Sequence, residues 1–217
     1  MNETLLNLQP LEAHFQRVFG DRTVIHEWFS QVILYAEGVT LADSYRTFGE
    51  VATAALQMTA EAHGITLSEH DARHIAGGIR NLPPHPEVAE SLGRLKSAGF
   101  RLVTLTNSPM AVVEEQMASA KLQPYLERNF SVDTVRKFKP APEPYRMVAR
   151  ELGTETNGLR MIAAHAWDIG GALQAGCAAA FVARPGKALF PLFPKPDIIG
   201  KNLQEISDAI LATEPRP

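Results

Sequence analysis

The chain shows two kinds of hydrophobic periodicity, one after the other. From residue 10 to about residue 81, apolar side chains recur at the three- and four-residue spacing of helices, as at Leu11, Phe15 and Val18. The same spacing continues through residues 28–35 and 48–58. Such stripes are typical of amphipathic helices that pack against one another. Residues 10–81 are therefore predicted to form a helical bundle.

Local signals set boundaries inside and after this bundle. Gly64 is placed to end the helix that contains residues 48–58, and Ser-Glu-His-Asp at 68–71 is typical of a capping box that opens the next helix. The run Leu-Pro-Pro-His-Pro at 82–86 cannot continue a helix, because proline lacks the backbone N–H and clashes with the preceding turn. We therefore predict a boundary near residue 82.

Beyond the prolines, short apolar segments alternate with helical stripes. Strands are predicted at residues 100–106, 130–133, 160–164 and 178–183, with a helix at 168–176. This alternation predicts an α/β fold with a parallel sheet, helices on both faces and a ligand site at the carboxyl ends of the strands. The candidate polar residues fall at these ends: Thr106, Asn107, Lys139, His165 and Asp168.

Composition excludes several classes of partner. The 217 residues carry 21 Lys and Arg against 24 Asp and Glu, a net charge of −3, which gives no basic surface for nucleic acid or anionic membranes. No apolar run approaches the roughly 20 residues of a membrane span. The start lacks the features of a signal peptide, and the single cysteine, Cys177, is expected to be a buried inert thiol. We expect a cytoplasmic protein.

Ordered motifs carry a resemblance to a known family. They are Asn-Glu-Thr-Leu at 2–5, Thr-Leu-Thr-Asn-Ser-Pro at 104–109, Ser-Val-Asp-Thr-Val-Arg-Lys-Phe-Lys-Pro at 131–140 with Tyr145 after it, and Ala-Trp-Asp at 166–168. In this order and separation they resemble the haloacid dehalogenase (HAD) superfamily, and within it the type II 2-haloacid dehalogenases. The resemblance covers nearly the whole chain.

The resemblance implies a Rossmann-like core with a helical cap inserted after its first strand. Residues 1–9 then correspond to a remnant of the catalytic loop of the core, residues 10–81 to the cap and residues 82–217 to the core. In this alignment the first core strand is missing. Members of the family often form dimers, so a homodimer is possible on the same ground.

The resemblance also implies a reaction, the hydrolysis of a small 2-haloacid or related carboxylate to the 2-hydroxy acid. In the family an aspartate four residues before a threonine displaces the halide and forms an ester that water then hydrolyses. Thr4 matches that threonine, which places the nucleophile ahead of Met1. We therefore expect Met1 to stand for an internal residue, and the chain as written to hold the pocket without its attacking carboxylate.

Other site residues follow from the resemblance one at a time. Thr106 and Asn107 match groups that bind the substrate carboxylate. Lys139 matches a lysine whose ammonium balances the nucleophile and the substrate, since paired anions in one pocket need a cation. Asp168 matches an acidic residue that holds this lysine and helps to position water, and Tyr145 matches a tyrosine near the pocket.

Departures from the family pattern bear on cofactors and substrate. Ala164 and Asn2 stand where phosphatase members have a metal-binding aspartate and a general acid. Because magnesium needs hard oxygen ligands, a reaction without metal or cofactor is predicted. Phe29 replaces an arginine that helps to bind the departing halide, and His165 stands where asparagine is common. We expect both residues to border the site and to alter the substrate range.

Simpler interpretations and other functions remain open. Asp168 could serve only as a helix N-cap, and His165 could be either a general base or an ordinary hydrogen-bonded residue. The pair His70 and His74 has metal-site spacing without an evident third ligand, so a solvated helix face is favoured. A non-catalytic HAD-like binding module is one alternative function, though a lost central strand would leave unpaired sheet edges and low stability. A magnesium-dependent phosphatase is the other.

Overall fold

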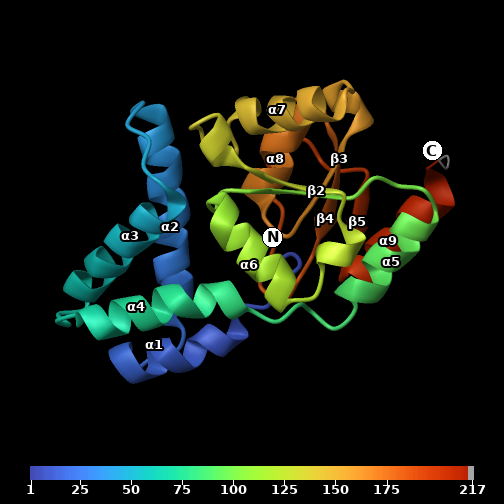
Figure 1. The fold of residues 1–217 in the computed structure, drawn as a ribbon. Coiled ribbons are helices and arrows are strands. Elements are labelled where there is room, and N and C mark those ends of the chain that lie inside the picture. Colours follow the sequence, from blue (N-terminus) through green and yellow to red (C-terminus); the bar gives the residue numbers. More distant parts are fainter. Residues whose placement is uncertain (215–217) are drawn as a thin grey trace.

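The computed structural model describes residues 1–214, and in it every regular element from residue 9 to residue 81 is helical. These helices lie to one side of the α/β part: the long helix α2 stands between α3 and the strands, and α1 and α4 lie below them (Figure 1). A 3₁₀ turn at Gln9–Leu11 precedes them. The helices are α1 (Glu12–Phe19), α2 (Val24–Leu41), α3 (Phe48–Ala62) and α4 (Glu69–Gly78).

Side-chain caps and aromatic contacts fix these helices. Ser68 Oγ accepts a hydrogen bond from the Asp71 backbone N–H at 3.1 Å, which confirms the predicted start of α4. Gly64 follows α3 with a φ of 66°, a conformation that glycine adopts without strain. Trp28 on α2 is buried and donates from Nε1 to the Ala52 carbonyl of α3 at 3.0 Å. The buried stripes of α1, α2 and α3 therefore meet in one core.

The α/β part alternates helices and strands, as predicted. Its elements are α5 (Val88–Ser97), β1 (Val103–Thr106), α6 (Met110–Ser119), β2 (Arg128–Ser131), α7 (Pro142–Leu152), β3 (Arg160–Ala163), α8 (Ala166–Gln174), β4 (Ala178–Val182), β5 (Ile198–Gly200) and α9 (Leu203–Thr213). The predicted end of the strand at 130–133 is wrong, because β2 ends at Ser131. Ser131 Oγ accepts a hydrogen bond from the Asp133 N–H at 3.2 Å and caps the 3₁₀ turn that follows. β5 and α9 were not predicted from the sequence.

The strands form two parallel sheets, which is consistent with the predicted parallel core. One sheet pairs β1 with β2, and the other has the order β3, β4, β5. Within residues 1–214 no ladder joins β1 to β3, and a cavity of about 510 Å³ lies between them. Helices α7 and α8 lie on one side of the strands, and α5 and α9 pack together on another (Figure 1). The division of the sheet lies where the sequence analysis expected the first core strand.

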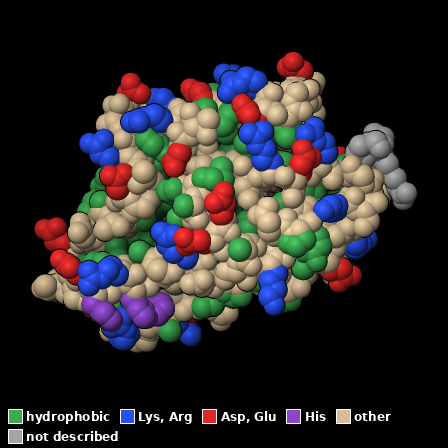
Figure 2. Space-filling model, viewed as in Figure 1, with side chains coloured by type: hydrophobic (Ala, Val, Ile, Leu, Met, Phe, Trp, Pro, Cys, Tyr) green, Lys and Arg blue, Asp and Glu red, His purple; other side chains and the backbone are tan. Residues whose placement is uncertain are grey.

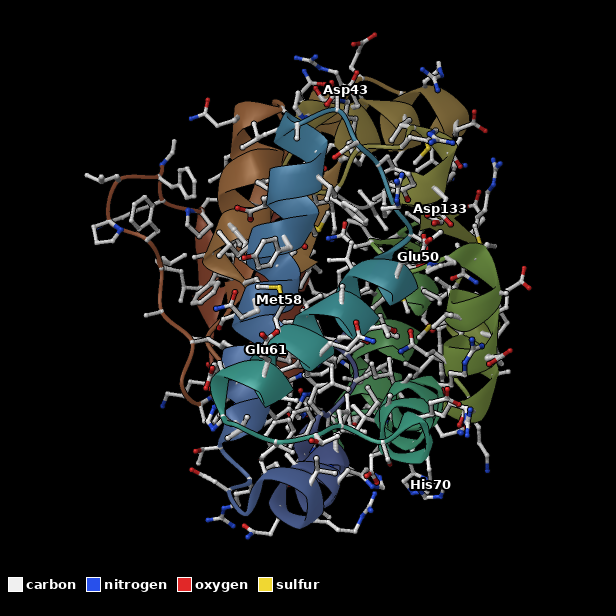
Figure 3. All side chains as sticks on the ribbon, turned by 90° about the vertical axis from the view of Figure 1, so that its left-hand side faces the viewer. Asp43, Glu50, Met58, Glu61, His70 and Asp133 are labelled. Atoms are coloured by element: carbon white, nitrogen blue, oxygen red, sulfur yellow. The ribbon has the colours of Figure 1, made fainter. Side chains whose placement is uncertain are left out.

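The connection between α2 and α3 ties the helical segment to the α/β part. Lys137 donates to Asp43 Oδ1 at 2.7 Å, the Phe138 backbone N–H donates to Thr40 Oγ1 at 3.0 Å, and the Tyr45 hydroxyl donates to Asp133. Figure 3 shows Asp43 at the end of α2, with Asp133 on the facing loop. These contacts hold α2 over the carboxyl end of β2.

The surface agrees with the small net charge. On the face shown in Figure 2, acidic and basic side chains are interspersed instead of gathered by sign. No helix in the described part of the chain is long and apolar enough to cross a membrane.

Candidate functional site

A buried ionic cluster lies at the carboxyl ends of β1 and β3. Lys139 Nζ donates to Asp168 Oδ2 at 2.6 Å, and the Tyr145 hydroxyl donates to Asp168 Oδ1 at 2.8 Å. Lys139, Asp168 and Tyr145 are only 4%, 3% and 1% exposed. Asp168 lies in the first turn of α8, where the helix dipole favours a negative charge. The structure thus brings three of the predicted site residues into direct contact.

The charge state of this cluster follows from its neighbours. Burial alone would raise the pKa of Asp168, but the charge of Lys139 and the hydrogen bonds from Lys139 and Tyr145 hold that pKa below its ordinary value. Burial, together with the charge of Asp168, raises the pKa of Tyr145 well above its ordinary value. Asp168 is therefore an anion at neutral pH and Tyr145 remains a hydrogen-bond donor.

Residues at the end of β1 hold the lysine in place. Asn107 Oδ1 accepts from the Lys139 backbone N–H at 3.2 Å, and Lys139 Nζ also donates to the Leu105 carbonyl at 3.2 Å. Thr106 Oγ1 accepts from the Ser108 N–H at 3.2 Å. The candidates Thr106 and Asn107 thus shape the two loops.

The first residues of the chain cross the ends of both sheets. Thr4 is buried, its Oγ1 accepts from the Ala164 N–H after β3 at 3.1 Å, and its carbonyl accepts from Arg184 at 2.7 Å. Arg184 also pairs with Glu87 at 2.8 Å. Asn2 accepts a hydrogen bond from Gln116 at 3.1 Å. Thr4 therefore lies beside β3, as a residue of the candidate site, and Arg184 is a buried cation that sequence analysis missed.

His165 belongs to a second ionic group beside the first. Its Nε2 lies 2.7 Å from Glu3 Oε2, and Lys187 Nζ lies 2.6 Å from Glu3 Oε1. The imidazole ring contacts two aromatic rings, with the Phe29 centroid at 5.8 Å and the Trp167 centroid at 5.2 Å. Phe29 comes from α2, so the helical segment contacts the site here. Glu3 and Lys187 could not be assigned to the site from the sequence, because no local pattern links residues so far apart.

Burial and pairing set the charges of this second group. Burial alone would raise the pKa of Glu3, but the hydrogen bond and charge of His165 and the nearby Lys187 lower it to about 2. Burial lowers the pKa of His165, which outweighs the opposite effect of Glu3. The group therefore consists of an anionic Glu3, a cationic Lys187 and an imidazole that is neutral at pH 7.

Replacing Glu3 should change how stability depends on pH. Its pKa falls from 4.5 to about 2 on folding, so Glu3 stabilises the fold above about pH 5 and loses that effect as pH falls from 4.5 toward 2. The full contribution is of the order of 3 kcal/mol. Urea unfolding should show Glu3→Gln least stable relative to the parent at pH 6, with the gap reduced by about half at pH 3 and closing only toward pH 2.

The exposed pair Glu69 and Arg73 supplies the control for this measurement. Its atoms lie 3.1 Å apart on a solvent-exposed helix face, so Glu69→Gln should leave the stability nearly unchanged at every pH. A gap between Glu3→Gln and the parent that stays constant from pH 6 to pH 3 would contradict the assigned charge of Glu3.

Gly171 sets the distance between α8 and the loop that carries Lys139. A Cβ atom at this position would lie 2.6 Å from Pro140 Cβ and 2.7 Å from the Pro140 carbonyl oxygen. Backbone atoms cannot yield as a flexible side chain can, so Gly171→Ala should cost about 1–3 kcal/mol of unfolding free energy in thermal or urea unfolding.

The matched control for Gly171 is an exposed helical glycine. Gly38 on α2 has no atom within 4 Å of a built Cβ. Gly38→Ala should therefore stabilise the chain slightly, by about 0.5–1 kcal/mol. Equal effects of the two substitutions would refute the close approach at Pro140.

The described residues hold no group of three or more His, Cys, Asp or Glu side chains that could bind a metal ion. The rings of His70 and His74 stack with centroids 5.6 Å apart, and His14 lies against His74 at 4.6 Å. Cys177 is buried as predicted, and burial raises the pKa of its thiol to about 11.

Comparison with known proteins places this arrangement in a family. The sequence pattern of the haloacid dehalogenase-like hydrolases matches residues 3–176. An (S)-2-haloacid dehalogenase of Pseudomonas putida is 24% identical over 181 residues, which is 83% of this chain and 80% of that protein. An (S)-2-haloacid dehalogenase of Xanthobacter autotrophicus is 27% identical over 183 residues, 83% of this chain and 72% of that protein.

Solved structures show the same fold. The structure of an L-2-haloacid dehalogenase from Xanthobacter autotrophicus superposes with a TM-score of 0.91 at 22% identity, covering 99% of this chain and 96% of that one. A predicted phosphoglycolate phosphatase from Haemophilus somnus superposes less well, with a TM-score of 0.59 at 17% identity over 83% of this chain and 90% of that one. The arrangement of helices and parallel strands is therefore that of the dehalogenase structures.

Proposed function

Because the chain belongs to the haloacid dehalogenase-like hydrolases, we propose that it serves the hydrolytic removal of halide from a small 2-haloacid, with the 2-hydroxy acid as product. The activity of the relatives in Pseudomonas putida and Xanthobacter autotrophicus supports this choice of substrate class. The observation that carries the proposal is the buried Lys139, Asp168 and Tyr145 cluster at the carboxyl ends of the strands.

The proposed reaction needs a cation where two anions meet. The attacking carboxylate and the carboxylate of the substrate repel each other, and a buried ammonium offsets that repulsion far better than water does. Lys139 supplies the charge, because Asp168, Asn107 and the Leu105 carbonyl hold it at the strand ends. In this proposal Thr106 and Asn107 lie beside the substrate carboxylate.

The reaction proceeds through a covalent ester. A carboxylate oxygen ahead of Met1, four residues before Thr4, attacks the carbon that bears the halogen, and the halide leaves with the bonding electrons. Water then attacks the ester carbonyl, the 2-hydroxy acid departs, and the carboxylate is restored. Asp168 orients that water while Tyr145 keeps Asp168 in position, and one proton is released to solvent for each turnover.

The cap side of the site would select the substrate. Phe29 and His165 bring an aromatic surface and a neutral imidazole where an arginine and an asparagine are common in the resembling family. A neutral, aromatic wall suits a short apolar side chain on the substrate. We place residues 10–81 as the cap, and the protein in the cytoplasm with a small carboxylate as its partner.

A magnesium-dependent phosphatase is the rival within the same family. Ala164 and Asn2 replace the acidic residues that such a reaction needs, and Asn2 accepts a hydrogen bond from Gln116. Ala164 is buried, and its methyl side chain has no oxygen that could bind a metal ion. These two residues favour the dehalogenase over the phosphatase.

The test compares two extended versions of the chain. Each receives, ahead of Met1, an apolar strand that ends in Asp in one version and in Asn in the other. With EDTA present, the Asp version should release chloride from (S)-2-chloropropionate, and the Asn version should be slower by about a thousandfold or more. Magnesium-dependent phosphate release from p-nitrophenyl phosphate, with no halide released by either version, would overturn the proposal.

A further inference from the structure

Glu3 is held in a backbone conformation that residues with a side chain rarely adopt. Its φ is 61°, in the left-handed region that favours glycine, because a Cβ atom there crowds the following carbonyl oxygen. Such a backbone angle persists only where surrounding contacts fix it. Here the side chain makes those contacts, since its carboxylate oxygens lie 2.7 Å from His165 Nε2 and 2.6 Å from Lys187 Nζ. The turn that contains Glu3 therefore brings a carboxylate to His165.

This carboxylate fixes the position of the proton on the imidazole of His165. An ionised carboxylate only accepts hydrogen bonds, so Nε2 must be the nitrogen that donates to Glu3. Burial lowers the pKa of His165, and the neutral ring is left with a lone pair on Nδ1. Within residues 1–214 Nδ1 makes no hydrogen bond, and it is not among the fully buried polar atoms that lack a partner. His165 thus presents an unprotonated and accessible nitrogen.

The imidazole lies next to the ionic cluster of Lys139 and Asp168. His165 is the N-cap residue of α8 and Asp168 is the third residue of that helix, two positions whose side chains approach each other. The His165 ring stacks on Trp167 with 5.2 Å between centroids, and Lys139 Nζ lies 5.7 Å from the centroid of the same Trp167 ring. A base therefore adjoins the residue that orients water in the proposed reaction.

Aromatic rings hold the imidazole in one orientation. Trp167 stacks on it at an angle of 19°, and Phe29 from α2 lies against it at an angle of 31°. Only 11% of the His165 side chain is exposed to solvent. The charged groups that act on the ring are Glu3 and Asp168, which raise its pKa, and Lys187, which lowers it. The ring is therefore positioned for proton transfer in a fixed geometry.

We propose that His165 is the general base of ester hydrolysis and that Glu3 is the positioning residue that fixes its tautomer, an inference that rests on the proposed function. The Nδ1 lone pair takes a proton from the water that attacks the ester carbonyl. When the tetrahedral intermediate collapses, the C–O bond to the product breaks, and this proton passes to the leaving alkoxide. The second proton of the water remains on the restored carboxyl group and is released to solvent, which gives one proton for each turnover.

The test measures ester hydrolysis by the 217-residue chain itself. The probe is (R)-2-acetoxypropionate, which has the ester linkage of the proposed intermediate and the configuration produced when halide is displaced from the (S)-acid. Because the probe carries its own ester carbonyl, its hydrolysis to acetate and lactate does not require the halide step. The matched control for His165→Asn is His63→Asn, since His63 also pairs with a glutamate, Glu27 at 2.9 Å, but on the exposed surface.

His165→Asn should lower the rate of hydrolysis by about 10²-fold or more, and His63→Asn should leave it close to that of the parent. The parent rate should rise with pH through the pKa of His165. Glu3→Gln removes an anion that raises this pKa, so the rise should move to lower pH. Lys187→Met removes a cation that lowers it, so the rise should move to higher pH. A purely structural role of these side chains would not produce opposite shifts.

A second readout follows the tautomer itself. In ¹⁵N NMR of the parent, His165 should carry its proton on Nε2, and thermal unfolding identifies the variants that are folded. If Glu3→Gln does not fold, Lys187→Met carries the test of the pH profile. Hydrolysis that is independent of His165, a proton on Nδ1 in the parent, or a Lys187→Met profile that does not move to higher pH would overturn the proposal.

Chloride release by the version extended with Asp ahead of Met1 tests the proposed function separately. Chloride release together with ester hydrolysis that is independent of His165 would refute the role of His165 alone. Ester hydrolysis that depends on His165, without any chloride release, would refute the dehalogenase reaction and leave the base in place.

Discussion

Replacing Lys139 by methionine should destabilise the chain by about 3–5 kcal/mol, the largest effect that we expect from one side chain. The methionine side chain is unbranched and one heavy atom shorter than that of lysine, and the substitution removes the charge. Asp168 would then be a buried anion without its partner, because Lys139 Nζ is the cation 2.6 Å from its carboxylate. Urea unfolding at neutral pH measures the loss, and lowering the pH should reduce it, since protonation of Asp168 removes the unpaired charge.

A neighbouring lysine provides the control for this prediction. Lys137 pairs with Asp43 at 2.7 Å, but Asp43 is largely exposed to solvent. Lys137→Met should therefore change the unfolding free energy far less, because water already screens that pair. If the two methionine variants were equally stable, the buried pair could not be the electrostatic centre of the site.

Replacing Asp168 by asparagine should separate the two steps of the proposed reaction. Asparagine can still accept the hydrogen bond from Tyr145, but it cannot orient water as an anion does. In the version extended with Asp ahead of Met1, the first halide should still leave, whereas hydrolysis of the ester should slow by about 10²–10⁴-fold. Rapid mixing should show one halide per enzyme followed by slow turnover, and mass spectrometry should detect the ester.

Asp133→Asn is the matched control for Asp168→Asn. Asp133 follows the neighbouring strand β2 and hydrogen-bonds to Tyr45, outside the ionic cluster. It should leave the steady-state rate close to that of the parent. A rate unchanged by Asp168→Asn, or loss of even the first halide, would show that Asp168 does not act in ester hydrolysis.

Much of the fold could be predicted from the sequence because it is determined by local patterns of residues. The helical spacing up to residue 81, the Ser68 cap and the alternating strands all depend on residues close in the chain. The end of β2 could not be predicted, because Val132 and Asp133 resemble the continuation of a strand. In the structure the Ser131 side chain caps a 3₁₀ turn that contains both residues. The three residues of β5 are too few to produce a periodic signal.

In the candidate site, too, some residues could be predicted from their place in the fold and others could not. Residues at strand ends, such as Lys139 and Asp168, could be expected to meet because parallel strands bring their carboxyl ends to one edge. Glu3, His165 and Lys187 could not be grouped in this way, because no element joins the first turn of the chain to the loop after β4. The same holds for Arg184, because its partners Thr4 and Glu87 both lie far from it in the sequence.

A single turnover in water enriched in ¹⁸O tests the central claim most directly. The extended chain with Asp ahead of Met1 is mixed in excess with (S)-2-chloropropionate, and both product and protein are analysed by mass spectrometry. If the reaction passes through an ester, the new hydroxyl oxygen comes from the protein carboxylate, so the product is unlabelled and the label appears in the protein. Label in the hydroxyl group of the first product would show direct attack by water and would contradict the account.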